Sequence, residues 1–177
     1  MKIYVDTRQQ EGKHELKHQW LKDHGYELVR KKLDVGDYML AERFAISVDT
    51  KRDMDEVAMN INGRNHARFR EECKRAMAQH IQLVVLVENH YEFDRIEDVA
   101  AWTNGHCKSC RRHYERGCNP HGPGKCPRHH TNKPIQGPRL AKAMKTMEER
   151  YGVRFMFCHP RQTGAMIDAI LKGGITW

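Results

Sequence analysis

Apolar positions near the start of the chain change from an unbroken run to a helical spacing. Residues 3–5 form a short apolar run that ends at Asp6, which is typical of a buried strand. Leu16, Trp20 and Leu21 would then share one face of a helix that Gly25 ends. The beginning of the chain therefore predicts a strand followed by a helix.

A spacing of two residues marks the next part of the chain. Residues 26–33 and 35–40 have the pattern of extended segments. Beyond them, two sets of side chains alternate, with Phe44, Ile46 and Val48 on one side and Ala45, Ser47 and Asp49 on the other. This is the period of a half-buried strand. We expect the segment at 44–49 to pair with 35–40 in a hairpin that turns near Ala41 and Glu42.

Helical spacing returns after this hairpin. It runs over residues 54–61, breaks at Asn62 and Gly63, and continues to His80. Its apolar face in the second part is marked by Phe69, Cys73 and Met77. Residues 83–87 are all apolar, which predicts a strand buried on both faces.

The last third of the chain repeats this alternation. A helix is expected over residues 138–151, ended by Gly152, and a strand over 153–158. Thr163 would cap a final helix that reaches Ile170. Alternating strands and helices predict a layered α/β domain, with Cys73 and Cys158 at apolar positions as core thiols.

Residues 104–133 break the pattern. Cysteine, histidine, glycine, proline and basic residues dominate there, and apolar residues nearly vanish, so this segment cannot build a core of its own. We expect residues 1–177 to form a single domain that carries 104–133 as a basic, Cys/His-rich insert.

Composition narrows the class of protein. The chain has 177 residues, a formal net charge of +8 and 39% hydrophobic residues, which suits a folded protein with a polyanionic partner such as nucleic acid. No apolar segment is long enough for a signal peptide or a membrane span, so we expect no membrane partner and an intracellular protein. In a reducing compartment, its six cysteines would be metal ligands or buried thiols.

The hairpin carries the residues of a metal-dependent nuclease site. Asp37 lies on its first strand, and Asp49 and Lys51 project from one face of its second strand. Two convergent carboxylates can hold Mg²⁺ or Mn²⁺, and Lys51 can orient a water or neutralise charge on a phosphate. This is the layout of the PD-(D/E)xK nucleases. The plain alternative is a solvated hairpin edge that happens to end in acid and lysine.

Several short motifs, in order, resemble one family. VDTR at 5–8, GDY at 36–38 and DTKRDMD at 49–55 are similar to the nuclease motifs of the XPF-type structure-specific endonucleases. Gly63-Arg64 with Phe69 and the strand LVVLVE at 83–88 extend the match. The resemblance covers residues 1 to about 90 and about 135 to 173.

The resemblance implies a fold and a function. The fold would be a restriction-endonuclease-like, three-layer α/β domain with a central mixed sheet flanked by helices. The activity would be Mg²⁺- or Mn²⁺-dependent cleavage of branched, flap or junction DNA in replication, recombination or repair. The family usually works as dimers, so a homodimer or a partner with a nuclease fold is expected. The helix near 139–151 or the last helix could present the dimer surface.

Site roles carry over position by position. Asp37 and Asp49 would be metal ligands and Lys51 the catalytic lysine. Asp6 and Asp55 would be supporting acids, with a structural alternative in which they cap a turn and a helix. The phosphate contacts implied are Arg8 and Arg64.

Three departures limit the transfer. Asp49 replaces a glutamate, Thr50 replaces an arginine, and Gln9 stands where the first motif usually ends in glutamate. They leave open a second class of function, a DNA-binding scaffold with a weak or inactive nuclease fold. The 177 residues also hold no counterpart of the DNA-binding helix-hairpin-helix pair that many relatives append. We therefore expect another part of the chain to bind the substrate.

The insert predicts a structural zinc site. The thiols are spaced as Cys107-x2-Cys110-x7-Cys118-x7-Cys126, in a segment that zinc binding could fold. A histidine could replace a cysteine, the candidates being His113, His121, His129 and His130. The other interpretations are a redox Cys-x-x-Cys pair and free cysteines in a loop.

Most of the excess charge of the chain lies in this insert. Its basic residues are Lys108, Arg111, Arg112, Arg116, Lys125, Arg128 and Lys133, against Glu115 alone. We expect Arg111, Arg112 and Arg116 to contact the DNA backbone, although such charges can also serve only solubility. A third class of function, a zinc-dependent regulator or assembly factor, would need the insert and not the hairpin site. The cytoplasm or nucleoid is the expected location, and a phage, prophage or microbial source is compatible with these features.

Overall fold

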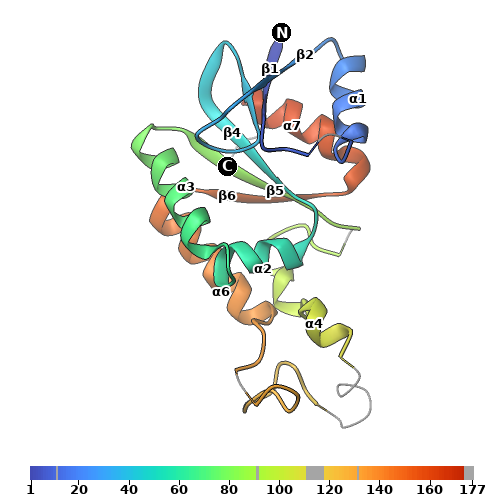
Figure 1. The fold of residues 1–177 in the computed structure, drawn as a ribbon, viewed down its shortest axis with the longest axis vertical. Coiled ribbons are helices and arrows are strands. Elements are labelled where there is room, and N and C mark those ends of the chain that lie inside the picture. Colours follow the sequence, from blue (N-terminus) through green and yellow to red (C-terminus); the bar gives the residue numbers. More distant parts are fainter. Residues whose placement is uncertain (11, 91, 111–117, 131, 174–177) are drawn as a thin grey trace.

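The computed structural model describes residues 1–10, 12–90, 92–110, 118–130 and 132–173. Within these residues one mixed sheet has the strand order β2-β1-β3-β4-β5-β6 (Figure 1). Strands β1 and β2, and strands β4, β5 and β6, are parallel neighbours, whereas β3 is antiparallel to both β1 and β4. The strands are β1 (Lys2–Asp6), β2 (Glu27–Lys31), β3 (Tyr38–Leu40), β4 (Arg43–Lys51), β5 (Gln82–Glu88) and β6 (Arg154–Cys158).

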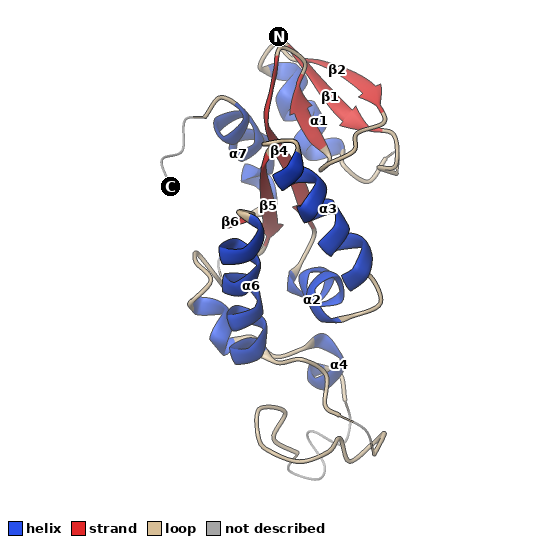
Figure 2. Cartoon of the chain, turned by 90° about the vertical axis from the view of Figure 1, so that its left-hand side faces the viewer, coloured by secondary structure: helices blue, strands red, loops and turns tan. Residues whose placement is uncertain are grey.

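Helices cover both faces of this sheet. One face carries α1 and α7, and the other carries α2, α3 and α6 (Figures 1 and 2). The main helices are α1 (Glu15–Asp23), α2 (Met54–Asn62), α3 (His66–Ala78), α6 (Gly137–Tyr151) and α7 (Thr163–Leu171). Shorter elements are η1 (Asp98–Ala101), α4 (Gly105–Lys108) and η2 (Pro160–Gln162). The predicted three-layer α/β fold with a mixed sheet is confirmed. None of the described helices is long and apolar enough to cross a bilayer.

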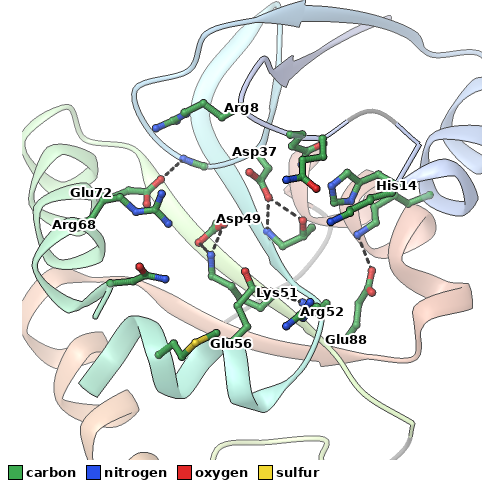
Figure 3. Close-up of a pocket in the computed structure, with 18 of the residues that line it drawn as sticks. Arg8, His14, Asp37, Asp49, Lys51, Arg52, Glu56, Arg68, Glu72 and Glu88 are labelled. Carbon is green, nitrogen blue, oxygen red and sulfur yellow. Dashed lines mark hydrogen bonds and ion pairs between the residues drawn. The ribbon is translucent and has the colours of Figure 1, made fainter. Parts of the chain in front are cut away.

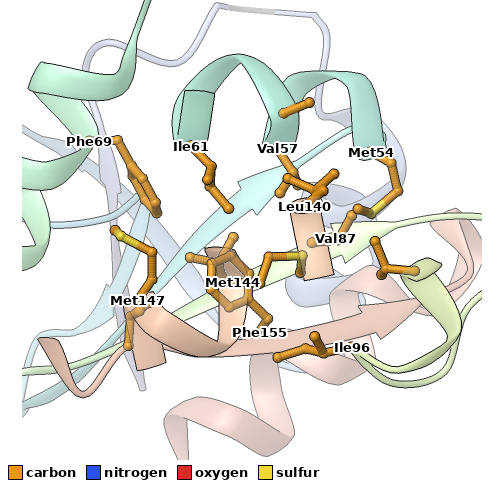
Figure 4. Close-up of a cluster of buried hydrophobic side chains, with 14 of the residues drawn as sticks. Met54, Val57, Ile61, Phe69, Val87, Ile96, Leu140, Met144, Met147 and Phe155 are labelled. Atoms are coloured by element: carbon orange, nitrogen blue, oxygen red, sulfur yellow. The ribbon is translucent and has the colours of Figure 1, made fainter. Parts of the chain in front are cut away.

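Strand β5 joins the two hydrophobic cores. Leu83, Val85 and Val87 pack into the core under α2, α3 and α6. Figure 4 shows this core, with Val87 labelled. Val84 and Leu86 point to the opposite face, under α1 and α7. Each residue of this run is 0–1% exposed, and burying one such side chain contributes roughly 1.5–3 kcal/mol. The prediction that residues 83–87 form a strand buried on both faces is therefore confirmed.

Two helices expose a residue that their spacing had placed inside. Leu16 is 72% exposed and Met77 is 52% exposed, whereas their neighbours Lys17 and Ala76 are buried. The prediction that Leu16 and Met77 face the core is wrong. In α1 the buried face turns toward Glu88, which pairs with Lys17.

The last helix begins differently from the prediction. Gln162 occupies the N-cap of α7, and Thr163 is its first residue. The Thr163 hydroxyl donates to Glu88 Oε1 at 2.8 Å and to the Pro160 carbonyl at 3.2 Å. The prediction of Thr163 as the cap is therefore wrong, because a buried carboxylate takes its hydroxyl. Cys73 and Cys158 are buried, as predicted.

The described part of the insert begins beside the start of α2 and extends away from the sheet (Figures 1 and 2). It contains the short helix α4 and otherwise turns and irregular backbone. The chain returns to the core at Gly137, the first residue of α6. A Cβ at Gly137 would lie 2.3 Å from the Val99 carbonyl oxygen, so only glycine fits this close approach.

Candidate active site

The carboxyl ends of β1, β4 and β5 meet at one edge of the sheet. These three strands run in the same direction, and the segments that follow β1 and end β4 and β5 line a cavity of about 560 Å³ (Figure 3). Helices α1 and α3 contribute its sides. A crevice at the carboxyl ends of parallel strands is a usual place for a functional site in an α/β fold.

Acidic side chains lie in this cavity beneath exposed basic ones. The acids are Asp37, Asp49, Glu56, Glu72 and Glu88, all buried or half-buried. The exposed basic residues are Arg8, Lys13, Arg52, Arg64, Arg68 and Arg75. The exposed basic residues would attract a polyanion, and the carboxylates beneath them can hold divalent cations.

Backbone hydrogen bonds to two strands hold Asp37. Its N–H donates to the Val48 carbonyl at 2.8 Å, and its carbonyl accepts from Asp6 N at 2.9 Å. Gly36 has a φ of 68°, and a Cβ there would lie 2.2 Å from Ser47 Oγ. Glycine therefore lets the chain turn tightly against β4 just before Asp37. Because of this turn, the extended segment predicted at 35–40 is a regular strand only over Tyr38–Leu40.

Thr50 fixes the Asp37 carboxylate. Its backbone N–H and its hydroxyl both donate to Asp37 Oδ2, at 2.9 and 2.8 Å. Both bonds use one oxygen, so neither engages Oδ1. The residue that departs from the family arginine thus has a direct positioning contact, which the motif alone did not indicate.

Asp49 and Lys51 form a buried pair on one face of β4. They are 5% and 6% exposed. Lys51 Nζ donates to Asp49 Oδ1 at 2.8 Å; it also lies 2.6 Å from Oδ2, but without hydrogen-bond geometry, so Oδ2 has no hydrogen-bond partner among the described residues. Burial raises the pKa of Asp49 to about 7, with Lys51 opposing and the Asp37 carboxylate adding to the rise. Burial also disfavours charge on Lys51, but Asp49 and Asp37 outweigh it and raise the Lys51 pKa.

The site can accommodate a divalent ion that brings ligands of its own. Asp49 and Asp37 line the same cavity, and the Oδ2 atom of buried Asp49 accepts no hydrogen bond from the described residues, although it lies in an ion pair with Lys51. Among the described residues no group of three or more His, Cys, Asp or Glu side chains is arranged to hold a metal. Mg²⁺ is commonly bound through one or two carboxylates, with waters and substrate phosphates completing its shell. The donor set therefore fits Mg²⁺ or Mn²⁺ better than a metal that needs an all-protein cage.

Asp6 holds Arg8 and does not line the cavity. Asp6 is 1% exposed, and its carboxylate accepts from the Arg8 backbone N–H at 2.9 Å and from Nε at 2.7 Å, with Nη2 also bonded. Arg8 Nη2 reaches the Leu33 carbonyl at 2.7 Å. The structure thus brings Arg8 to the cavity rim and places Asp6 behind it as its anchor.

Asp55 also lies outside the cavity lining. Its Oδ1 accepts from the backbone N–H of Gly105 at 2.8 Å, and a Cβ at residue 105 would meet Oδ2 at 2.5 Å. Asp55 therefore ties the first residue of α4, at the base of the insert, to the start of α2. The structural alternative for this acid describes its contacts better than a role as a supporting acid.

Helix α3 and the turn before it line the cavity with more charge than the motifs predicted. Arg64 lies at the rim as expected, and Arg68, Glu72 and Arg75 follow it on the same side. Glu72 Oε1 accepts from the Gly36 N–H at 2.9 Å. The spacing of three and four residues could have identified this face, but nothing in the sequence showed that the face meets the hairpin.

A buried ion pair closes another side of the cavity. Lys17 Nζ donates to Glu88 Oε1 at 2.7 Å, and Thr163 donates to the same oxygen. The side chains of Lys17 and Glu88 are 9% and 13% exposed. This pair joins α1, β5 and α7 at the site, and its partners lie 71 residues apart, which no local motif reveals.

The four insert cysteines line a second cavity of about 380 Å³. Burial raises the pKa of the Cys107 thiol, whose sulfur accepts from Gln136 Nε2 at 3.3 Å. His106 and His129 line this cavity too, whereas His121 bonds to Thr103 Oγ1 at 3.0 Å. Arg111, Arg112, His113 and Arg116 lie outside the described residues, so their predicted roles stay predictions.

Comparison with known proteins gives a family and a fold. A family model described as the ERCC4 domain matches residues 5–169. No curated protein matches the chain. The solved structure of XPF from Aeropyrum pernix is similar, with a TM-score of 0.57, 20% identity, and coverage of 98% of this chain and 65% of that chain. XPF from Aeropyrum pernix in complex with DNA gives the same TM-score and identity, and coverage of 98% and 64%. The chain thus spans less than two thirds of these structures, and the likeness is one of fold.

Proposed function

The chain belongs to the ERCC4 domain family, and on that premise we propose that it is a metal-dependent endonuclease that hydrolyses phosphodiester bonds in DNA. The observation that carries the proposal is the cavity at the strand ends. It combines Asp37, Asp49 and Lys51 with a rim of exposed basic residues. A metal-assisted attack on a phosphate needs carboxylates, a cation near the phosphate and electrostatic capture of a polyanion.

Asp37 and Asp49 are the residues proposed to hold Mg²⁺ or Mn²⁺. Such an ion polarises a phosphate and lowers the pKa of a bound water. Thr50 keeps the Asp37 carboxylate in place, and Lys51 keeps a positive charge beside Asp49. Lys51 would stabilise the charge that grows on the phosphate, or orient the attacking water.

Arg8, Arg64 and Arg68 are proposed to bind the DNA backbone beside the reacting phosphate. They are exposed at the rim, and Arg8 is oriented by its bonds to Asp6 and Leu33. Contacts of this type give salt-dependent affinity that does not depend on sequence. Selection would then rest on DNA shape, and the substrate that the family resemblance implies is branched, flap or junction DNA in replication, recombination or repair. Such a role would place the protein in the cytoplasm or on the nucleoid.

The direct test is a cleavage assay. Purified protein is incubated with labelled duplex, single-stranded, flap and four-way DNA in Mg²⁺, Mn²⁺ or EDTA. We expect cutting in Mg²⁺ or Mn²⁺, none in EDTA, and a preference for branched DNA over the plain duplex. Folded protein that binds these DNAs and cuts none of them in either metal would favour the DNA-binding scaffold. One observation favours that second function: Asp49 is 5% exposed and is held by Lys51.

We propose zinc as the structural cofactor of the insert and Cys107, Cys110, Cys118 and Cys126 as its ligands. All four thiols line one cavity. Among the described residues no group of three or more His, Cys, Asp or Glu side chains is arranged to hold a metal, so zinc would have to draw the thiols together, as it does in domains that fold on binding metal. Asp55 anchors the insert to α2 next to the catalytic strand. This contact would couple an ordered, basic insert to the DNA at the cavity.

Zinc content tests this cofactor. Protein expressed with added zinc is expected to contain about one zinc ion per chain. Cys107→Ser with Cys110→Ser is expected to lose it and to weaken DNA binding while the sheet stays folded. Cys73→Ser is the matched control because Cys73 is a buried core thiol, and it should keep the zinc. Elemental analysis and circular dichroism measure both results. Zinc-free wild-type protein with full DNA affinity would contradict the proposal.

Pairing with a second copy or with a related subunit stays a prediction. Helices α6 and α7 place their buried residues in the two cores, so a dimer contact would use their outer faces. Sedimentation of the purified chain with and without DNA distinguishes a monomer from a dimer.

A further inference from the structure

Gln9 presents an unpartnered donor to the active-site cavity. The residue is 8% exposed and lines the cavity beside Asp37. Its Oε1 accepts from the Tyr38 hydroxyl at 3.1 Å, whereas its Nε2 is buried with no partner among the described residues. A buried amide N–H without an acceptor is costly to keep. It is therefore a feature to explain by a ligand that enters the cavity.

A hydrogen-bond chain behind Gln9 sets the orientation of its amide. Because the Tyr38 hydroxyl donates to Gln9, this chain requires the His18 tautomer with its proton on Nε2, which lies 2.9 Å from the same hydroxyl. Burial lowers the pKa of His18 to about 4, so its ring is neutral at neutral pH. With its oxygen engaged by Tyr38, the amide can offer only its nitrogen to the cavity. His18 and Tyr38 are positioning residues for Gln9.

The backbone around Gln9 is fixed relative to the catalytic carboxylates. Gln9 N donates to the Asp6 carbonyl at 3.1 Å, and Asp6 N donates to the Asp37 carbonyl at 2.9 Å. Arg30 Nη2 bonds the carbonyls of Thr7 and Gln9 at 2.8 and 3.1 Å. The turn that carries Gln9 is thus tied directly to the backbone of Asp37.

The neighbouring wall of the cavity consists of further donors. It comprises Gln9, Lys13, His14 and Lys17, which we call the α1 wall. His14 Nδ1 is buried without a partner among the described residues, and His14, at the N-cap of α1, makes no side-chain capping bond. The free N–H groups of a helix start favour an anion. Of the acids in the described lining that act on His14, Asp37 is already bonded to Thr50, and Glu88 is bonded to Lys17 and Thr163.

We propose that the Gln9 amide nitrogen donates a hydrogen bond to a phosphate of the DNA backbone, and that the α1 wall is the subsite for that phosphate. The inference deepens the proposed function and rests on DNA being the ligand of the cavity.

The test measures DNA binding without cleavage. Fluorescein-labelled flap DNA is titrated in Ca²⁺, in place of Mg²⁺ to limit cutting, with wild type, Gln9→Met and Gln9→Glu. Gln9→Met keeps the size of the side chain and removes the donor, so we expect about tenfold weaker binding from the loss of a bond to a charged group. Gln9→Glu keeps an acceptor for Tyr38 and should bind at least as weakly. Gln19→Met is the matched control, because its exposed amide already donates to Asp23 at 2.7 Å.

A spectroscopic readout separates contact from mere support of the fold. In ¹⁵N-labelled wild type, the side-chain NH₂ signals of Gln9 are identified by their absence in Gln9→Met. Flap DNA is expected to shift these signals, and Tyr38→Phe is expected to reduce the shift. Unmoved signals, or a Gln9→Met protein that binds like wild type, overturns the subsite. Wild type that binds through Gln9 but never cuts upholds the subsite and refutes the nuclease, whereas wild type that binds no flap DNA overturns both.

Discussion

Asp37→Asn is expected to lower the rate of DNA cleavage about a thousandfold or more while the protein remains folded. The substitution removes one of the two carboxylates proposed to hold the divalent ion, whose contribution is several kcal/mol, and each 1.36 kcal/mol is a factor of about ten in rate. Asparagine keeps an oxygen that can accept from the Thr50 N–H and hydroxyl, now at 2.9 and 2.8 Å. The measurement is a single-turnover cleavage rate on the preferred DNA at saturating Mg²⁺, with thermal melting as the check on folding.

The matched control for this prediction lies three residues earlier. Asp34 is exposed, does not line the cavity, and contacts Arg75 through its backbone carbonyl and not through its carboxylate. Asp34→Asn makes the same chemical change in the same loop and should leave the rate unchanged. An Asp37→Asn protein that cuts at the wild-type rate would remove Asp37 from the metal site.

Lys51→Met is expected to destabilise the folded protein by about 3 to 5 kcal/mol, in addition to abolishing cleavage. Methionine fills similar space but leaves the Asp49 carboxylate without its cation, and both residues are at least nine-tenths buried. Removing one partner of a buried ion pair destabilises the fold by more than an exposed ion pair stabilises it. The reason is that the remaining charge has neither water nor a partner around it. Urea denaturation in EDTA measures the change without interference from metal.

Two further variants test the reason for this loss. Asp49→Asn added to Lys51→Met removes the orphaned charge and should recover most of the stability, since the two sites are coupled. Lys74→Met breaks the exposed contact of Lys74 with Glu71 at 2.8 Å and should change stability little. A Lys51→Met protein as stable as wild type would show that Asp49 is either solvated by water or protonated in the fold, because loss of Lys51 raises the pKa of Asp49 further.

Much of the site was predictable because short motifs carry their own geometry. Asp49 and Lys51 are two residues apart on a strand, so the pleat alone puts them on one face. Asp37 precedes the strand that pairs with theirs, and the hairpin brings it to the same cavity. Arg8 and Arg64, for which the motifs implied phosphate contacts, line the same cavity, and those contacts stay a prediction.

Three positions have a distant partner that the local pattern of the sequence did not indicate. Leu16 was expected inside, but the ion pair of Lys17 with Glu88 turns that face of α1 toward β5. Asp55 was expected as a supporting acid or as a structural cap, and its carboxylate accepts from the backbone N–H of Gly105. Thr163 was expected as a cap, but its hydroxyl bonds to Glu88. Hydrophobic spacing identifies which side chains are buried, but it does not identify which polar groups form hydrogen bonds or ion pairs with one another.

The sequence by itself determined the order of strands and helices, the burial of β5 and the spacing of Asp37, Asp49 and Lys51, because each follows from the local period of the chain. Only the tertiary structure decided that Glu72 and Glu88 join these residues, that Thr50 holds Asp37, and that Gln9 offers a free N–H to the same cavity. The reason is physical. Parallel strands gather residues from remote parts of the chain at one edge of the sheet, and a hydrogen bond or buried ion pair exists only where packing brings its two partners together.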